Sequence, residues 1–256
     1  MESPQLVWAK NWIRTKKTSF IGGEHYASEK QEIWVSTCPA TGEPLTTLQF
    51  AGSDTVNAAV KSAKSAFESS SWKGLHPKDR AQVLFRIADA IRKHHAELAT
   101  LEVLENGKTY REAYEDDIPE AAEIFEYYAG WCTKVYGDTC PVGPSFLNYT
   151  LREPVGVCAL IVPWNFPLLL ACWKVSACLS MGNTAILKPA PQTSTSLLKF
   201  AEILAEEKIL PPGVINVVLG GSSTGDLLSA HPQIDKISFT GSTAVGKQIV
   251  RQSGYH

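Results

Sequence analysis

The chain has 256 residues, of which 44% are hydrophobic and 20% are charged, and its formal net charge is -2. This length allows one large domain or two ordinary ones, and the composition excludes an intrinsically disordered chain. No run of basic residues is longer than two, which disfavours binding to nucleic acid. The longest apolar run, 166–179, is interrupted by Lys174 and is too short to cross a bilayer, so no membrane partner is expected.

The six cysteines are scattered, with no Cys-x-x-Cys pair and no regular spacing. This pattern argues against a disulfide framework and for a reducing compartment. The N-terminus lacks a basic segment followed by an apolar core, so no signal peptide is expected and the predicted location is the cytoplasm. No spacing of His, Cys and Asp is typical of a metal site, and none is predicted.

The first half of the chain is predicted to be irregular and then helical. Residues 20–23 are expected to form a strand that enters a turn. A first helix has Ser53 or Asp54 as its N-cap and hydrophobic residues at helical spacing to residue 67. A second begins near Pro77 and, alone or with a continuing helix, ends at Asn106-Gly107. A third covers 111–136.

The polar residues of these helices do not indicate a site of their own. His94 and His95 are adjacent on a helix, so they point about 100° apart and are interpreted as surface residues. Glu105, Asp116 and Asp117 are interpreted as helix charges or caps.

Residues 137–153, called the arm below, differ in character from the helices before them. Glycines and prolines punctuate the start, and residues 146–151 then alternate with period two. This pattern predicts an edge hairpin. An extended ribbon that leaves a globular body often pairs with another subunit.

From residue 154 the pattern becomes strand and helix in alternation. The predicted strands are 155–162, 184–187, 214–219 and 236–239, and the predicted helices are 167–181, 193–208, 224–230 and 242–251, with Thr193 or Ser194 as a cap. Four strands that alternate with four helices predict an α/β fold, in which a parallel sheet has helices on both faces.

The stretch Pro163-Trp164-Asn165-Phe166-Pro167, called the Trp-Asn turn below, follows the first of these strands. Proline cannot donate to a strand ladder, so the chain must leave the sheet here. The turn therefore carries an aromatic ring and a side-chain amide at the carboxyl end of a buried strand, where ligands bind in open α/β sheets.

Two glycine-containing turns follow later strands. Phe239-Thr240-Gly241-Ser242 leads from a strand into a helix that contains Gly246, and free N–H groups there would attract a phosphate. The spacing Gly-x-x-x-x-Gly is not the common dinucleotide fingerprint, so an ordinary strand-to-helix turn is the alternative. The loop 220–225 has the same two interpretations.

Lys188 follows its strand directly, at the same predicted sheet edge as Asn165 and Gly241. A lysine there can bind ribose hydroxyls or phosphate, and a solvated strand-end lysine is the alternative. Two phosphate-type turns, a lysine and the Trp-Asn turn at successive strand ends together describe a nucleotide site.

The chain resembles the aldehyde dehydrogenase superfamily from about residue 20 onward. The resemblance is carried by Pro163-Trp164-Asn165-Phe166-Pro167, Gly182-Asn183-Thr184, Lys188-Pro189, Pro211-Pro212-Gly213, Phe239-Thr240-Gly241-Ser242-Thr243, Pro39-Ala40-Thr41-Gly42-Glu43, Glu105-Asn106-Gly107-Lys108 and Tyr127-Tyr128-Ala129-Gly130-Trp131. It is greatest to the betaine, retinal and general aldehyde group. It implies a Rossmann-like NAD(P)-binding fold with an oligomerisation hairpin, and three parts of the chain: the N-terminal part of the cofactor domain (1–136), the hairpin (137–153) and the Rossmann-like NAD(P)-binding part (154–256).

The resemblance also implies roles for single residues. Asn165 would donate its amide to the substrate oxyanion, and Lys188 would hold the adenosine ribose. Gly241 and Ser242 would hold the pyrophosphate. The other implied cofactor contacts are Ile161, Val162, Pro163, Trp164, Gly221, Gly225, Phe239, Thr240, Val245 and Gly246.

The implied reaction is the NAD(P)-dependent oxidation of an aldehyde to a carboxylic acid through a cysteine thioester. The family's nucleophilic cysteine and general-base glutamate lie beyond the residue matched by His256, so we expect a truncated form without the catalytic domain. The expected partners are an aldehyde and, in the full-length form, further copies in a homodimer or homotetramer. The alternatives are a non-catalytic short form that binds a nucleotide or a partner, and a structural remnant that binds neither.

Pro191 departs from the family pattern, because many NAD-preferring members have a glutamate three residues after the lysine. NAD is the expected cofactor, and NADP is the alternative that this departure leaves open.

Overall fold

The computed structural model describes residues 3–28 and 32–254, so the outer ends of the predicted first and third parts, 1–2 and 255–256, lie outside the described residues. Its centre is a six-stranded sheet in the order β10-β7-β8-β9-β1-β2. The strands are β1 (Ser19–Ile21), β2 (Glu24–Tyr26), β7 (Val157–Ile161), β8 (Thr184–Lys188), β9 (Ile215–Val217) and β10 (Lys236–Phe239). The strands β7 to β10 are parallel, which confirms the predicted α/β fold, and β1 and β2 extend the sheet antiparallel.

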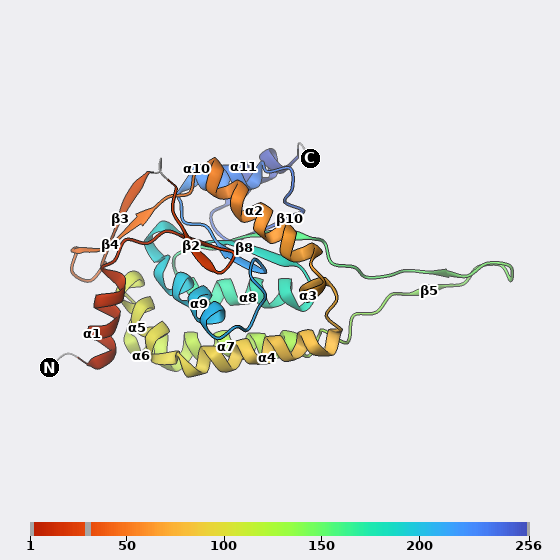
Figure 1. The fold of residues 1–256 in the computed structure, drawn as a ribbon, viewed down its shortest axis with the longest axis horizontal. Helices are drawn as coiled ribbons and strands as arrows, with labels where there is room; N and C mark the ends of the chain where they lie inside the picture. The colour runs from red at the N-terminus through yellow and green to blue at the C-terminus, as the bar shows by residue number, and fades with distance from the viewer. Residues whose placement is uncertain (1–2, 29–31, 255–256) are drawn as a thin grey trace.

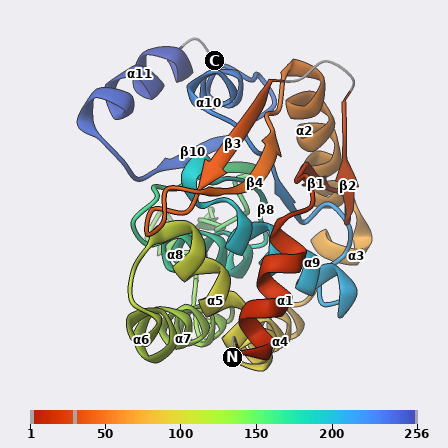
Figure 2. The ribbon, with the colours of Figure 1, turned by 90° about the vertical axis from the view of Figure 1, so that its left-hand side faces the viewer.

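Helices cover both faces of this sheet (Figure 1). On one face lie α2 (Ser53–Glu68), α10 (Ser222–Ser229) and α11 (Thr243–Ser253). On the other lie α8 (Pro167–Ser180) and α9 (Thr195–Glu206), and behind them pack α4 (Pro77–Lys93), α5 (His95–Asn106) and α7 (Ile118–Ala129) (Figure 2). The remaining helices are α1 (Pro4–Ile13), α3 (Ser70–Lys73), α6 (Tyr110–Glu112) and a 3-10 turn at Pro191–Thr193.

Alternation along the buried strands explains why both faces are covered. In β7, Val157 and Ala159 join the cluster under α2, whereas Cys158 and Leu160 join the larger cluster under α8. Successive side chains of a strand point to opposite faces. A strand that is apolar at every position must therefore be buried on both sides, as the sequence predicted for this segment.

The helical first half agrees with prediction in outline and differs at three places. The first helix is capped by Gly52 rather than Ser53 or Asp54. The second does begin at Pro77, and a break at His94 separates α4 from α5. The third, predicted at 111–136, is interrupted by a π-helical turn at Ala113–Asp117 and ends at Ala129.

The second half keeps the predicted order of strands and helices, and its boundaries shift by a few residues. β7 starts two residues later than predicted because Gly156 has φ 131°, outside the range of a strand. α9 starts at Thr195, and neither Thr193 nor Ser194 caps it with its side chain. β9 is shorter than the predicted strand 214–219, and α10 begins at Ser222 rather than near Thr224.

The arm projects away from the body (Figure 1). It pairs β5 (Thr139–Cys140) with β6 (Asn148–Tyr149) antiparallel, as an isolated two-stranded ribbon. Its apolar side chains are exposed, including Phe146, Leu147 and Leu151 at 70% or more. A second ribbon, β3 (Ile33–Thr37) with β4 (Pro44–Gln49), lies against the loop before α9, where the Ser36 hydroxyl donates to the carbonyl oxygen of Gln192. Within the described residues, no helix combines the length and the apolar character that a membrane span needs.

Candidate functional site

The predicted site residues begin on one row of the sheet. Ile161 at the end of β7 is in register with Lys188 on one side and with Phe239 on the other. The row continues beyond the strands, because the N–H of Val162 donates to the carbonyl of Lys188 and the N–H of Thr240 donates to the carbonyl of Ile161. Three segments far apart in the sequence therefore end side by side, and we call them, with the turns that follow, the strand-end site.

Lys188 is not a solvated lysine. Its side chain is buried, with 6% of the residue exposed, and its ammonium group donates to the carbonyl oxygen of Pro189 at 3.3 Å. Burial lowers the pKa of Lys188 to about 8. Among the described residues no carboxylate pairs with it. A buried cation without a counter-charge is expensive, and an acceptor-rich ligand such as a ribose or phosphate would lower that cost.

Gly225 in the first turns of α10 lies against this lysine. A Cβ at position 225 would stand 3.7 Å from Cε of Lys188. Gly221 is the N-cap of α10, and no side chain caps this helix end. The predicted residues Lys188, Gly221 and Gly225 therefore do come together, next to helix N–H groups without a side-chain acceptor.

The turn into α11 lies at the other end of the row. The Ser242 hydroxyl accepts a hydrogen bond from the N–H of Val245 at 3.4 Å and so caps the helix, with its own proton left to donate to a ligand. Gly241 and Gly246 both face the ring of Phe239, and a Cβ at Gly241 would come 2.5 Å from it. These glycines thus have a packing role whether or not a phosphate binds.

The Trp-Asn turn lies between these two turns and begins directly after Val162. Trp164 is 58% exposed and Asn165 is also exposed, so both side chains are open to a ligand. Val162 just before the turn and Pro167 at its end are buried. An exposed aromatic ring and amide on a rigid support are suited to ligand contact.

The support of this turn was not foreseen from the sequence. The side chain of Asn106 donates to the carbonyl oxygens of Trp164 at 2.7 Å and Asn165 at 3.3 Å. Two residues further along the chain, the ammonium group of Lys108 pairs with the buried carboxylates of Glu102, at 2.9 Å, and Asp117. Residues 105–108 supported the family resemblance, but no local signal indicates that they contact residues sixty positions away.

The interpretations of Asp117 and His94 were wrong, whereas Glu105 is a cap, as one of its two interpretations had it, but of a distant helix. Asp117 is buried in the ion pair just described, whereas its neighbour Asp116 is exposed. Glu105 is buried and caps a distant helix, because its carboxylate accepts from the N–H groups of Thr195, at 2.6 Å, and Ser196, at 3.1 Å. His94 is partly buried and bonds to Glu97 and Glu207.

Four of the cysteines are buried and none lies in the strand-end site. Cys158 is in β7, Cys172 and Cys178 are on α8, and Cys132 follows α7. Burial raises the pKa of Cys172 well above its ordinary value. A hydrogen bond between the thiols raises the pKa of Cys178 and lowers that of Cys158. Because these thiols are buried, they are poorly suited to attack a substrate.

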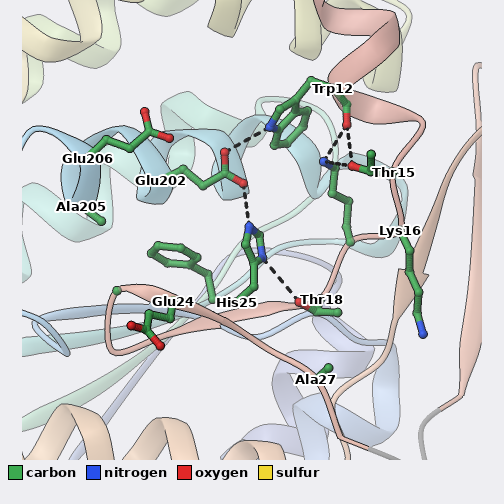
Figure 3. A pocket seen from close by; sticks show the side chains of 13 residues that line it. Trp12, Thr15, Lys16, Thr18, Glu24, His25, Ala27, Glu202, Ala205 and Glu206 are labelled. Atoms are coloured by element: carbon green, nitrogen blue, oxygen red, sulfur yellow. Dashed lines mark hydrogen bonds and ion pairs between the residues drawn. The ribbon is translucent and has the colours of Figure 1, made fainter.

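Two cavities differ in their relation to the site. One of about 830 Å³ is lined by the turn into α11, including Phe239, Thr240, Gly241, Ser242 and Gly246. Another of about 840 Å³ lies near the opposite sheet edge, by β1 and β2 (Figure 3).

In the second cavity the buried charges have partners. Glu202 accepts from the ring N–H of Trp12 and bonds to His25, each at 3.1 Å, while Lys17 donates to the Trp12 carbonyl at 2.7 Å (Figure 3). This group ties α1 and β2 to α9 and is explained by the fold. Within residues 3–28 and 32–254, no three His, Cys, Asp or Glu side chains cluster so as to hold a metal ion.

Comparisons with known proteins agree with the geometry. Residues 25–256 match the Aldehyde dehydrogenase family. The chain is 44% identical to DhaS of Bacillus subtilis (strain 168) over 242 residues, which cover 94% of this chain and 49% of DhaS. It is 41% identical over 252 residues to the cytosolic 10-formyltetrahydrofolate dehydrogenase of Homo sapiens, covering 96% of this chain and 28% of that protein.

Among solved structures, the NAD⁺ complex of aldehyde dehydrogenase from Bacillus cereus is similar, with a TM-score of 0.93 and 42% identity. The similarity covers 100% of this chain and 51% of that one. The chain thus spans about half the length of DhaS and of the Bacillus cereus protein. Since the family match covers most of the chain, the chain belongs to the aldehyde dehydrogenase family.

Proposed function

We propose that this chain carries the NAD(P)-binding part of an oxidoreductase that oxidises an aldehyde to a carboxylic acid. The observation that carries the proposal is the row of Phe239, Ile161 and Lys188, which brings the turn into α11, the Trp-Asn turn and a buried lysine to one sheet edge, and no carboxylate of the described residues pairs with that lysine. The family membership and the NAD⁺ complex of the Bacillus cereus relative support it.

The described residues fit a dinucleotide at the strand-end site. Lys188 has donors for ribose hydroxyls, and Gly225 lies beside it with no side chain between the two. The hydroxyl and N–H groups of the turn 241–243 suit the pyrophosphate. Ile161, Val162, Pro163, Trp164, Gly221, Phe239, Thr240, Val245 and Gly246 would complete the contacts.

Asn165 is proposed to act on the aldehyde. Its amide N–H groups would donate to the carbonyl oxygen as negative charge develops there, which lowers the barrier to nucleophilic addition. A bound nicotinamide supplies the hydride acceptor. The thiol that adds to the aldehyde, and the base that activates water to release the acid, are assigned to a part of the whole protein outside this chain's matched residues.

Cofactor binding is testable on the chain itself by titration calorimetry with NAD. We expect the unmodified chain to bind NAD, and Lys188→Ala to weaken binding at least tenfold because the ribose loses its donor. Lys64→Ala, on the exposed side of α2, is the matched control and should bind like the unmodified chain. Equal affinity of Lys188→Ala and the unmodified chain would contradict the role of Lys188.

NAD is the proposed cofactor rather than NADP, and Pro191 makes this choice testable. Pro191 opens the 3-10 turn after Lys188, where many relatives that prefer NAD have a carboxylate. We expect Pro191→Glu to weaken NADP binding tenfold or more, because a carboxylate repels the 2′-phosphate, and to leave NAD binding unchanged or stronger. If Pro191→Glu weakened the binding of NAD and of NADP by the same factor, residue 191 would not lie beside the ribose.

The partners of the whole protein are proposed to be an aldehyde and further copies of itself, in a homodimer or homotetramer. The arm supports the second part, because Phe146, Leu147 and Leu151 are exposed on an unpaired ribbon. Sedimentation of Leu147→Asp against the unmodified chain should show dissociation.

A cytoplasmic location is part of the proposal, since free cysteines suit a reducing compartment.

A non-catalytic short form that binds a nucleotide or a partner is the second candidate. The burial of Cys132, Cys158, Cys172 and Cys178 favours it for this chain in isolation. We expect no NADH formation when the purified chain is mixed with NAD and an aldehyde. NADH formation would exclude this candidate.

A further inference from the structure

We propose that Asn106 is a positioning residue that holds the Trp-Asn turn in its ligand-facing orientation. The ion-paired side chains of Glu102, Lys108 and Asp117 support the same turn. This inference deepens the proposed function and rests on it. It assigns to Asn106 no contact with substrate or cofactor.

The amide of Asn106 holds the turn by its backbone. Its Nδ2 donates to two successive carbonyl oxygens, those of Trp164 at 2.7 Å and Asn165 at 3.3 Å. The side chains of Trp164 and Asn165 are exposed, and among the described residues neither makes a hydrogen bond that would fix its direction. The direction in which the Asn165 side chain points therefore depends on the hydrogen bonds that Asn106 donates to the backbone of the turn.

Asn106 is itself held firmly by the end of its helix. It is the last residue of α5, and Gly107 after it has φ 84°, the left-handed conformation that closes a helix. A Cβ at Gly107 would stand 2.7 Å from Cγ of Pro39, so the chain passes close to another segment here. The Asn106 side chain thus leaves a rigid point of the fold.

Glu102 and Lys108, which form an ion pair, contact the residues that follow Asn165. Glu102 accepts from the N–H of Leu168 in the first turn of α8 at 3.4 Å. Lys108 lies 4.4 Å from the ring centroid of Phe166, a cation–π contact. The Trp-Asn turn is therefore held at two carbonyls and one ring, and Leu168 just after it is held at its N–H, all by residues of the segment 102–108.

The π-helical turn at Ala113–Asp117 completes the group. One extra residue in a helical turn rotates the residues that follow, and such turns often occur at functional sites. Here Asp117 is buried against Lys108, whereas Asp116 stays exposed. The two buried carboxylates hold Lys108 in place under the Phe166 ring. This arrangement argues that the ion-paired residues fix the position of the Trp-Asn turn and do not serve stability alone.

The test uses Asn106→Asp, which keeps the shape of the side chain and removes its donors. The control is Asn11→Asp, the same change at an exposed position of α1. The main measurement is amide hydrogen exchange of a peptide spanning 164–170, with a peptide spanning 184–188 as the internal reference. We expect Asn106→Asp to speed exchange of the first peptide about tenfold and to leave the second unchanged, and we expect no effect of Asn11→Asp.

A merely structural role would give a different result, because a general loss of stability speeds exchange in both peptides equally. That result, or unchanged exchange at 164–170 in a folded Asn106→Asp protein, would overturn the proposal. Asn106→Gln, which keeps the donor on a longer side chain, should restore part of the protection. If Asn106→Asp does not fold, Asn106→Leu, of similar volume and without a donor, takes its place with the same expectations.

The exchange measurement needs no cofactor, so it separates this inference from the proposed function. NAD binding by the unmodified chain decides the proposed function alone. Where NAD binds, Asn106→Asp should weaken binding several-fold through Trp164, and Asn11→Asp should not.

Discussion

The carboxylate of Glu105 accepts a hydrogen bond from the N–H of Thr195 at 2.6 Å, across 90 positions of the sequence. It also accepts from the hydroxyl of Thr195 at 2.6 Å and from both the N–H and the hydroxyl of Ser196. A single side chain of α5 thereby caps α9, which has no cap of its own. An anion is also favoured at this end of the helix dipole.

Replacing Glu105 by Gln should therefore destabilise the chain by about 2–3 kcal/mol, because the new NH₂ group cannot accept and leaves two of the four donors without an acceptor. Urea unfolding measures the change. Glu120→Gln on the exposed side of α7 is the matched control and should stay within about 0.5 kcal/mol of the unmodified chain. A loss of the same size in both variants would contradict the capping role.

Lys188→Met should stabilise the free chain near neutral pH. The lysine has a pKa of about 8 in the folded chain because it is buried, below its ordinary 10.5. Both states are charged at pH 7, so the folded state bears the full desolvation cost, on the order of 3 kcal/mol. As the pH rises from 8 to 10.5 the folded state loses its proton first, and this cost disappears.

The advantage of Lys188→Met in urea unfolding should accordingly be largest at pH 7 and shrink toward pH 10. Lys64→Met, at an exposed position, should show no such trend. An advantage that stays constant with pH would mean that the charge of Lys188 is not its source.

Gly156→Ala should cost about 3 kcal/mol of stability. The residue has φ 131°, which a side chain strains, and a Cβ would overlap the carboxylate of Asp235. That carboxylate accepts from the N–H of Val157 at 2.8 Å, so β7 would lose its first anchor. Gly143→Ala in the arm, with nothing within 4 Å, is the control. Thermal unfolding of both variants decides the matter, and similar melting temperatures would argue against strain at Gly156.

Ellman's reagent should label the native chain at one cysteine quickly. Cys140 on the arm is exposed, Cys38 is half-buried, and the other four thiols are buried. Thiol reactivity requires access as well as a thiolate, so Cys140→Ser should remove the fast phase. All six should react in guanidinium. Fast labelling that persists in Cys140→Ser would reveal an accessible thiol in the body of the protein.

The sequence predicted the strand-end site better than its support. Phe239, Ile161 and Lys188 each end a strand, and the rule that parallel strands end at one edge was sufficient to bring them together. Glu102 and Asp117 gave no such signal. Charged residues in helices are usually at the surface, and only packing reveals which of them are buried and paired.

The sequence by itself determined the alternation of strands and helices and the position of the Trp-Asn turn, because hydrophobic periodicity and prolines act locally, and its motifs carried the resemblance to the family. The tertiary structure decided that Lys188 is buried, with no counter-charge from the part of the chain that the structure describes, that Glu105 caps α9 and that Asn106 holds the carbonyls of Trp164 and Asn165. The hydrogen bonds of Asn106 and Glu105 join residues 58 to 90 positions apart, and no local pattern specifies their partners.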